Sequence, residues 1–159
     1  MTIRQKITPY LWFDRNAAAA VDLYVSLFPR SRILSTSYYL EGGMLPAGTP
    51  MAIAFELEGQ KFVALNGGPY FKLTEAMSLF VACDDQAEID RLWDRLGEGG
   101  QVQQCGWLRD RFGLSWQINT GLIEDFMQDP DPGRRARVYQ AMLGMVKIDI
   151  AALEAARAG

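Results

Sequence analysis

The chain has 159 residues, of which 49% are hydrophobic and 22% charged, and its net charge of −3 corresponds to a pI near 5.0. This composition is typical of a single globular domain, and the lack of a basic excess argues against binding to nucleic acid. The apolar runs are too short to cross a bilayer and the N-terminus has no signal-peptide pattern, so we expect a cytoplasmic protein that binds no membrane.

The first half of the chain predicts a strand, a helix and three further strands. Residues 6–13 are rich in aromatic and β-branched side chains, which favours a strand, and Asp14 or Asn16 can cap the helix that follows. An apolar stripe over residues 17–28 predicts that helix, and a proline ends it. The remaining strands are expected at residues 31–40, 51–57 and 60–66.

The same order of elements recurs in the second half, with a strand at 76–83, a helix at 86–96, short strands within 101–109 and a strand at 114–119. Phe13-Asp14 matches Cys83-Asp84 at an offset of 70. Leu65-Asn66-Gly67 likewise matches Ile118-Asn119-Thr120 near the close of each half. Such an ordered set of matches predicts a duplicated βαβββ unit.

The predicted fold class is therefore α+β, with two βαβββ modules that form a cupped mixed or antiparallel sheet. We expect one domain over residues 1–159, in which module 1 spans about 1–70 and module 2 about 71–121. A helical extension is predicted over about 122–159, with its last helix starting at Asp149. These helices are expected to cover a sheet edge or a subunit interface.

Histidine is absent from the sequence. Because histidine is the commonest transition-metal ligand and the usual general base near neutral pH, its absence excludes a Ser-His-Asp triad, a Cys-His pair and any histidine-bearing metal site. The two cysteines, Cys83 and Cys105, cannot form a disulfide framework or a metal cluster by themselves. Each is interpreted as a small structural side chain.

Four stretches of the sequence, ITPYLWFDRNAAAAVDLYVSLFP, FVALNGGPYFK, QCGWLRDRFGLSWQ and QAMLGMVKIDIAALEAA, resemble one known group of proteins. This group is the PhnB-like branch, often labelled demethylubiquinone methyltransferase-like, of the vicinal oxygen chelate superfamily. Glyoxalase, bleomycin-resistance proteins and extradiol dioxygenases belong to the same superfamily. The resemblance covers nearly the whole chain and implies paired βαβββ modules and a homodimer.

The resemblance also implies where a metal would bind. Metal-chelating members of the superfamily draw their ligands from four strands, at positions that correspond here to Ile7, Ala64, Met77 and Gln117. Divalent metals prefer charged oxygen or imidazole ligands, so one neutral amide is an insufficient set. We therefore expect no metal and no cofactor. The methyltransferase label has no support from the glycines, since none opens a helix after a strand with the spacing of a cofactor-binding turn.

Gln117 is the leading candidate for a ligand contact. By the alternation of a strand it shares a face with Ser115 and Asn119, and the family plan points this face into the cup. Gln117 can hydrogen-bond a ligand, or it can satisfy backbone or water within the cup. Phe13 is expected to line the cup, whereas Trp12 and Trp116 are expected to face the helices. The candidate ligand-binding residues are Gln117, Asn66, Phe13, Tyr70, Phe71 and Trp107.

Each of the other candidates has a structural alternative. Asn66 can contact a ligand or cap the turn at Gly67-Gly68. Tyr70 and Phe71 can form a lid or wall of the cup, or they can be core aromatics. Trp107 is placed at the mouth of the cup.

Three functions remain open from the sequence. The first is a module that binds an unidentified small molecule in a cup with apolar walls; those walls would be Ile7, Phe13, Phe55, Met77 and Leu79. The second is a metal-independent isomerase or lyase that uses Glu56, Asp110 or a tyrosine for proton transfer. The third is a dimeric scaffold whose cup is vestigial.

Overall fold

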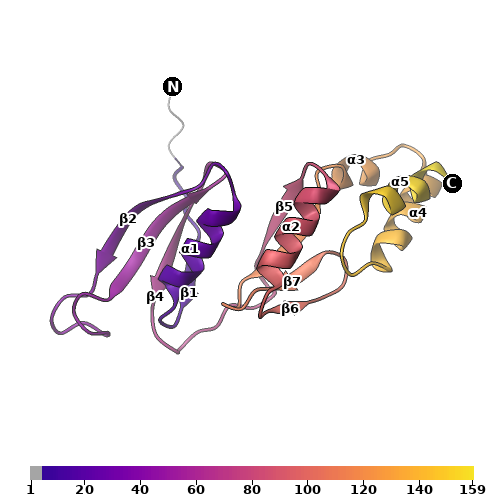
Figure 1. The fold of residues 1–159 in the computed structure, drawn as a ribbon. Helices are drawn as coiled ribbons and strands as arrows, with labels where there is room; N and C mark the ends of the chain where they lie inside the picture. The colour runs from indigo at the N-terminus through magenta and orange to yellow at the C-terminus, as the bar shows by residue number, and fades with distance from the viewer. Residues whose placement is uncertain (1–4) are drawn as a thin grey trace, which may run out of the picture. The chain divides into compact units, whose positions relative to one another are not determined.

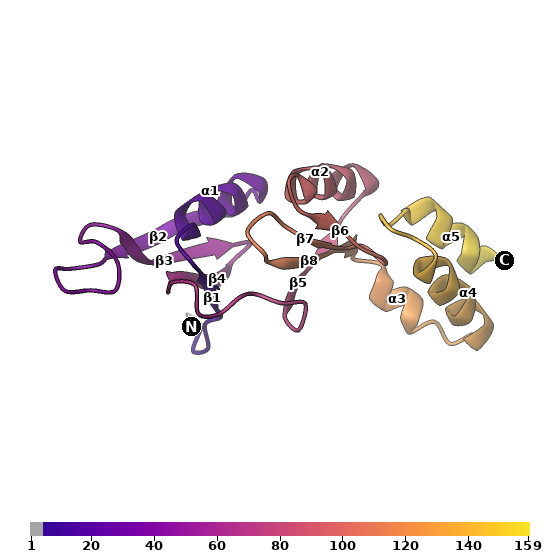
Figure 2. The ribbon, with the colours of Figure 1, turned by 90° about the horizontal axis from the view of Figure 1, so that it is seen from below.

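The computed structural model describes residues 5–159, which divide into two compact units, the first ending at Leu73 and the second covering Thr74–Gly159. Each unit contains a four-stranded sheet with a helix on one face (Figures 1 and 2). The strand order is β1-β4-β3-β2 in the first sheet and β5-β8-β7-β6 in the second. This arrangement confirms the predicted α+β class, while the prediction that both modules act as one domain stays a prediction.

The first unit follows the predicted order of elements. Its elements are β1 (Tyr10–Phe13), α1 (Ala17–Leu27), β2 (Arg32–Tyr38), β3 (Pro50–Leu57) and β4 (Gln60–Asn66). β1 runs parallel to β4, and the other pairs are antiparallel. The first strand is shorter than predicted because residue 9 is a proline, which has no N–H for the sheet, and β1 begins directly after it.

The core of the first unit lies between α1 and the sheet. Tyr24 of α1 packs against Phe55 at a ring distance of 6.4 Å, and Phe55 stacks on Phe62 at 5.5 Å. Phe13 is 2% exposed and pairs in register with Asn66, whose side chain bonds the start of α1. The prediction that Phe13 lines the cup was therefore wrong. That prediction counted the alternation of side-chain faces from residue 7, which lies outside β1.

The second unit repeats this plan. Its elements are β5 (Ser78–Cys83), α2 (Gln86–Gly97), β6 (Gln101–Val102), β7 (Trp107–Arg109) and β8 (Ser115–Thr120). α2 begins with a side-chain cap, because Asp85 accepts a hydrogen bond from the Glu88 N–H at 2.8 Å. The buried row of the sheet contains Leu108 and Trp116, as expected for residues that face the helix.

Backbone hydrogen bonds align the two units with each other, and this alignment differs by one residue from the one that the sequence match predicted. The Gly67 N–H donates to the Phe13 carbonyl at 2.9 Å, and the Gly121 N–H donates to the Cys83 carbonyl at 3.1 Å. Residue 66 therefore corresponds to residue 120, not to Asn119. The sequence match followed the shared asparagine, whereas the backbone places the end of each unit at the glycine.

The C-terminal extension belongs to the second unit and consists of α3 (Ile123–Met127), α4 (Pro132–Leu143) and α5 (Ile150–Ala158). The N–H groups of Cys105 and Gly106 donate to the carbonyls of residues 145 and 146, each at 2.8 Å. The Gln86 side chain donates to the Ile148 carbonyl and accepts from the Ile150 N–H, both at 2.9 Å. The extension thus attaches to the β6–β7 turn and to the start of α2. None of the helices over residues 5–159 has the length and apolarity needed to cross a membrane.

Candidate functional site

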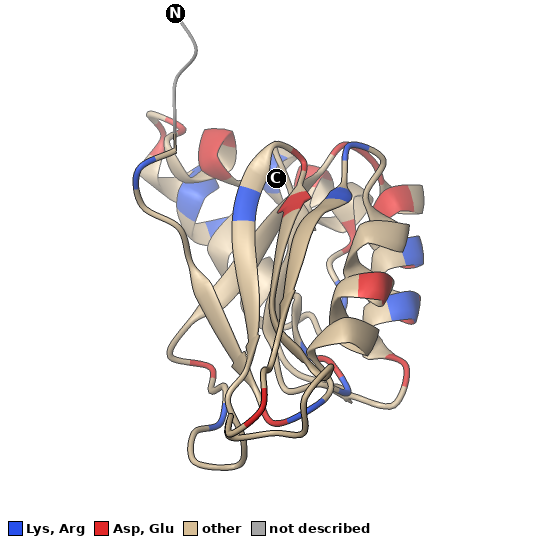
Figure 3. Ribbon diagram, turned by 90° about the vertical axis from the view of Figure 1, so that its left-hand side faces the viewer, with Lys and Arg blue, Asp and Glu red and all other residues tan. Residues whose placement is uncertain are grey.

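The candidate site is the face of the second sheet that points away from α2, here called the open face (Figure 2). Figure 3, in which the first unit faces the viewer, shows Lys, Arg, Asp and Glu mostly on helices and near strand ends. The register places the following residues on the open face: Ser78, Phe80, Ala82, Trp107, Arg109, Ser115, Gln117 and Asn119.

Gln117 lies at the centre of the open face, as the sequence predicted. Phe80 of β5 and Trp107 of β7 are its direct cross-strand neighbours, so an amide lies between two aromatic side chains. The Gln117 Nε2 donates to the Ser78 Oγ at 2.9 Å. This bond uses one of the two amide hydrogens and fixes the direction of the side chain.

Ser115 lies one row away from Gln117, between Ser78 and Arg109. Its side-chain oxygen is fully buried and has no hydrogen-bond partner among the described residues. A buried hydroxyl without a partner costs about 1–3 kcal/mol. The Ser115 hydroxyl, one row from the Gln117 amide, is therefore available for a further hydrogen bond.

Arg109 is held at the edge of the open face. Its Nη2 donates to the Gln101 Oε1 at 2.9 Å, and its Nη1 lies 3.8 Å from the Glu75 Oε1. The Glu75 carboxylate also accepts from the Gln103 amide at 3.0 Å. Its own backbone N–H, followed by the Gln103 amide, lowers the pKa of Glu75. Gln101 and Glu75 thus hold the guanidinium of Arg109, whose backbone pairs with Ser115.

The first unit lacks the amide at the centre of this face. Val63 pairs with Tyr10 and with Ala54, so it takes the place that Gln117 holds in the second unit. The counterpart of Gln117 is therefore Val63 rather than Ala64, which is fully buried on the face toward α1. The two copies have diverged, and only the second carries an amide at this position.

The residues at the superfamily's metal positions do not fit a metal ion. Ile7 is 84% exposed and precedes β1, and Met77 precedes β5. Val63 or Ala64 supplies no ligand atom, which leaves the neutral amide of Gln117 alone. Across residues 5–159, no group of three Cys, Asp or Glu side chains gathers in a way that could hold a metal ion.

The side chain of Asn66 forms hydrogen bonds with backbone groups. Its Oδ1 accepts from the Ala17 N–H and its Nδ2 donates to the Pro50 carbonyl, both at 2.9 Å. Asn66 therefore caps α1 across the sheet, a task that the sequence assigned to Asp14 or Asn16, and the Asn16 side chain makes no cap bond. A ligand contact by Asn66 stays a prediction.

Tyr70 and Phe71 are exposed rather than part of the core, at 75% and 66%. Phe71 packs edge-on against Trp12 at 4.9 Å, and the Trp12 Nε1 donates to the Gly68 carbonyl at 2.9 Å. The register puts Trp12 on the face away from α1, so the prediction that it faces the helix was wrong, for the same reason as for Phe13. Phe71 thus packs against Trp12 on the face of the first sheet away from α1, while Tyr70 is exposed.

The candidate acid-base groups have structural partners. The Asp110 carboxylate is 3% exposed and accepts from the N–H groups of Phe112 and Leu114 and from the Trp116 Nε1, at 2.9, 3.1 and 2.9 Å. Glu56 pairs across strands with Lys61 and lies 4.0 Å from the Arg32 guanidinium. Asp110 thus organises the β7–β8 turn.

Phe80 and Ser78 were absent from the sequence-predicted site. The sequence placed Leu79 in the wall because it counted the alternation from Met77, which precedes the strand. The register instead brings the even-numbered residues of β5 beside Gln117. β5 pairs with β8 although the two strands are about forty positions apart in the sequence. The faces of β5 could not be assigned because the first residue of this strand was not known from the sequence.

Comparison with known proteins gives the following matches. The family model described as 3-demethylubiquinone-9 3-methyltransferase matches residues 5–119. A solved PhnB protein from Bacillus cereus, carrying the same description, is 38% identical; the match covers 73% of this chain and 98% of that chain, with a TM-score of 0.68. A Pseudomonas aeruginosa protein with 24% identity, covering 74% of this chain and 98% of that chain, has a TM-score of 0.60 and shares the fold. A comparison with curated proteins gave no match.

Proposed function

Because this chain belongs to the PhnB-like family described as 3-demethylubiquinone-9 3-methyltransferase, a branch of the vicinal oxygen chelate superfamily, we propose that its second sheet binds a small, partly aromatic molecule without a metal ion. One observation carries the proposal: the Gln117 amide lies between Phe80 and Trp107 on the open face. The two rings offer apolar area to a ligand ring, and the amide hydrogen-bonds a ligand carbonyl or hydroxyl.

The neighbouring row supports the same assignment. The buried Ser115 hydroxyl has no partner among the described residues, and a ligand oxygen or a bridging water would satisfy it. Ser78 already bonds Gln117 at 2.9 Å, so the amide is held in place before a ligand arrives. The proposed ligand therefore carries an apolar ring and one or two oxygen atoms.

The methyltransferase description of the relatives is not adopted for this chain. The turns between β1 and α1 and between β5 and α2 run through Asp14-Arg15-Asn16 and Asp84-Asp85. Both turns begin with an aspartate and contain no glycine, whereas a dinucleotide-type or methyl-donor site uses a glycine-rich turn at this place. A metal-independent isomerase or lyase remains the alternative, and it has less support because Asp110 and Glu56 are engaged in structural contacts.

Nuclear magnetic resonance of the 15N-labelled full chain tests the proposal with a library of phenols and aromatic amides. The indole N–H of Trp107 reports on the open face, and that of Trp116, which donates to Asp110 at 2.9 Å, serves as the internal control. We expect fragments that shift the Trp107 signal in a saturable way and leave the Trp116 signal unchanged.

Two glutamine variants sharpen the test. Gln117→Ala is expected to weaken the binding of the best fragment about fivefold, the ratio for one lost hydrogen bond of ~1 kcal/mol. Gln140→Ala removes an exposed glutamine from α4 and should leave the affinity unchanged. A library that never shifts Trp107, or a Gln117→Ala variant that binds as tightly as the parent chain, would overturn the proposal.

A further inference from the structure

The C-terminal extension contains a pocket of about 440 Å³ among α3, α4 and α5. Its walls combine apolar side chains, Leu122 and Phe126, with charged side chains from all three helices, Asp125, Arg134, Glu154 and Arg157. The volume is within the range of small-ligand sites. The pocket lies outside residues 5–119, the segment that the family model matches.

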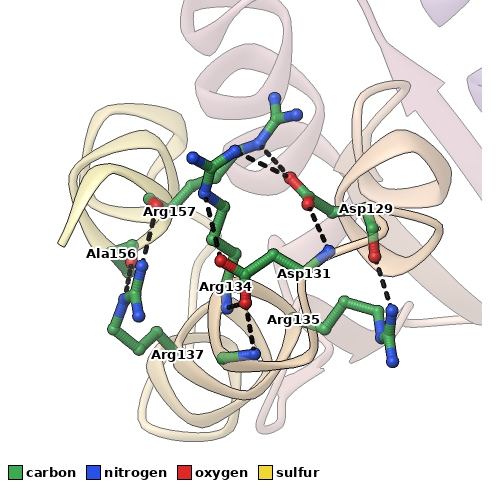
Figure 4. Close-up of polar contacts among 8 residues, drawn as sticks. Asp129, Asp131, Arg134, Arg135, Arg137, Ala156 and Arg157 are labelled. Atoms are coloured by element: carbon green, nitrogen blue, oxygen red, sulfur yellow. Dashed lines mark hydrogen bonds and ion pairs between the residues drawn. The ribbon is translucent and has the colours of Figure 1, made fainter.

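A buried aspartate engages the two arginines of this pocket (Figure 4). The Asp129 side chain is 1% exposed and accepts from the Arg157 Nε at 3.0 Å, and it lies 3.9 Å from the Arg134 Nη1. Asp131 adds a second carboxylate, 3.7 Å from the Arg134 Nε. The Asp131 N–H, followed by Arg157 and Arg134, holds the pKa of Asp129 below its usual value, so the aspartate is charged at neutral pH. Two aspartates thus balance the two arginines.

The pocket walls are fixed by further contacts between the helices. Arg137 of α4 donates to the carbonyls of Ala156 and Arg157 at 2.9 and 3.1 Å, and so closes the end of α5. The Arg157 guanidinium lies over the Phe126 ring at 5.4 Å, which ties α5 to α3. A pocket whose walls are held in this way loses little conformational entropy when it binds a ligand.

The remaining charges of the pocket are negative. Asp125 of α3 and Glu154 of α5 line the pocket, and neither forms an ion pair or hydrogen bond with another residue in the described range 5–159. Leu122 and the buried Phe126 supply apolar surface beside them. The pocket therefore combines an apolar wall with two carboxylates that form no ion pair among the described residues.

We propose that this pocket binds a small organic cation, with its ammonium group paired to Asp125 and Glu154 and its apolar body against Leu122 and Phe126. A carboxylate accepts charge-assisted hydrogen bonds from an ammonium group, and the apolar wall distinguishes an organic amine from an inorganic ion. The proposal is independent of the open face of the second sheet, because it uses other residues and another ligand chemistry.

Binding of 2-phenylethylammonium to the full 15N-labelled chain tests this proposal, with 2-phenylethanol and 3-phenylpropionate as neutral and anionic comparators. The cation is expected to shift backbone amides of α3 and α5 in a saturable way and to bind more weakly at high salt. The alcohol and the carboxylate should bind at least fivefold more weakly. Equal binding of either comparator would overturn the assignment of a cation site.

Matched variants locate the charges. Glu154→Gln and Asp125→Asn are each expected to weaken the cation about fivefold, which is ~1 kcal/mol. Glu124→Gln, an exposed neighbour outside the pocket lining, should leave the affinity unchanged. Because Glu154 and Asp125 are exposed, both variants should fold. Unchanged affinity in both would refute the proposal.

Discussion

Asp110 offers a sharp test of how the second unit is built, since one carboxylate organises the turn that joins β7 to β8. In Asp110→Asn, one side-chain oxygen can still accept from Phe112 and Leu114, but an NH2 group then meets the Trp116 Nε1–H. The variant loses a charge-assisted bond and places two donors against each other, terms of about 1.5–3 and 1–3 kcal/mol that partly overlap. We expect a net loss of about 2–4 kcal/mol of unfolding free energy.

Urea denaturation of the full chain, followed by tryptophan fluorescence, measures this loss. Asp22→Asn, at an exposed position on α1, is the matched control and should change the unfolding free energy by less than about 0.5 kcal/mol. Trp116→Phe removes the indole N–H that meets the new NH2 group in Asp110→Asn. The double variant should therefore lose less unfolding free energy than the sum of the two single losses. Additive losses, or an Asp110→Asn variant as stable as the parent chain, would refute the assigned role of Asp110.

Three further predictions follow from single contacts. Gly67→Ala should displace the Trp12 ring, because a Cβ would lie 2.3 Å from it, and should cost about 1–3 kcal/mol in the same assay; an unchanged emission spectrum and stability would contradict this. Burial raises the pKa of Cys83 to about 12, so this thiol should resist a disulfide reagent at pH 8 until the chain is denatured, and rapid native labelling would contradict it. The Asp90 hydrogen bond, at 2.8 Å, raises the pKa of Lys147 above 10.5, and Asp90→Asn should abolish the loss of stability as pH rises through that pKa; an unchanged pH profile would contradict the pairing.

The order of elements could be predicted from the sequence because local patterns determine it. Local patterns predicted a strand at 51–57 and a helix at 86–96, and the structure places β3 at Pro50–Leu57 and α2 at Gln86–Gly97. The family resemblance, drawn from the stretches around LNGGP and the β7–β8 turn, is confirmed by the family model and by the Bacillus cereus structure.

The direction of individual side chains was harder to predict. The alternation of a strand assigns faces only when the strand's first residue is known, and Pro9 delays the start of β1. This displacement reversed the expected faces of Trp12 and Phe13, whereas Gln117 and Trp116 were assigned correctly because β8 begins close to its predicted position.

Contacts between segments far apart in the chain could not be predicted from the sequence either. Asn66 caps a helix that begins about fifty residues earlier, and Phe80 reaches Gln117 only through the pairing of parallel strands. The pocket of the extension depends on the burial of Asp129, which no local sequence pattern indicated. Local periodicity contains no signal for such long-range partners.

The central claim is that the open face around Gln117 binds a small molecule without a metal ion. The most direct measurement is the dissociation constant of the best fragment, from the Trp107 indole shift, before and after dialysis against a chelator, with bound metal determined by plasma emission. We predict the same dissociation constant in both samples and metal well below one ion per chain. A loss of affinity of more than tenfold after chelation, restored by a divalent ion, would contradict the claim.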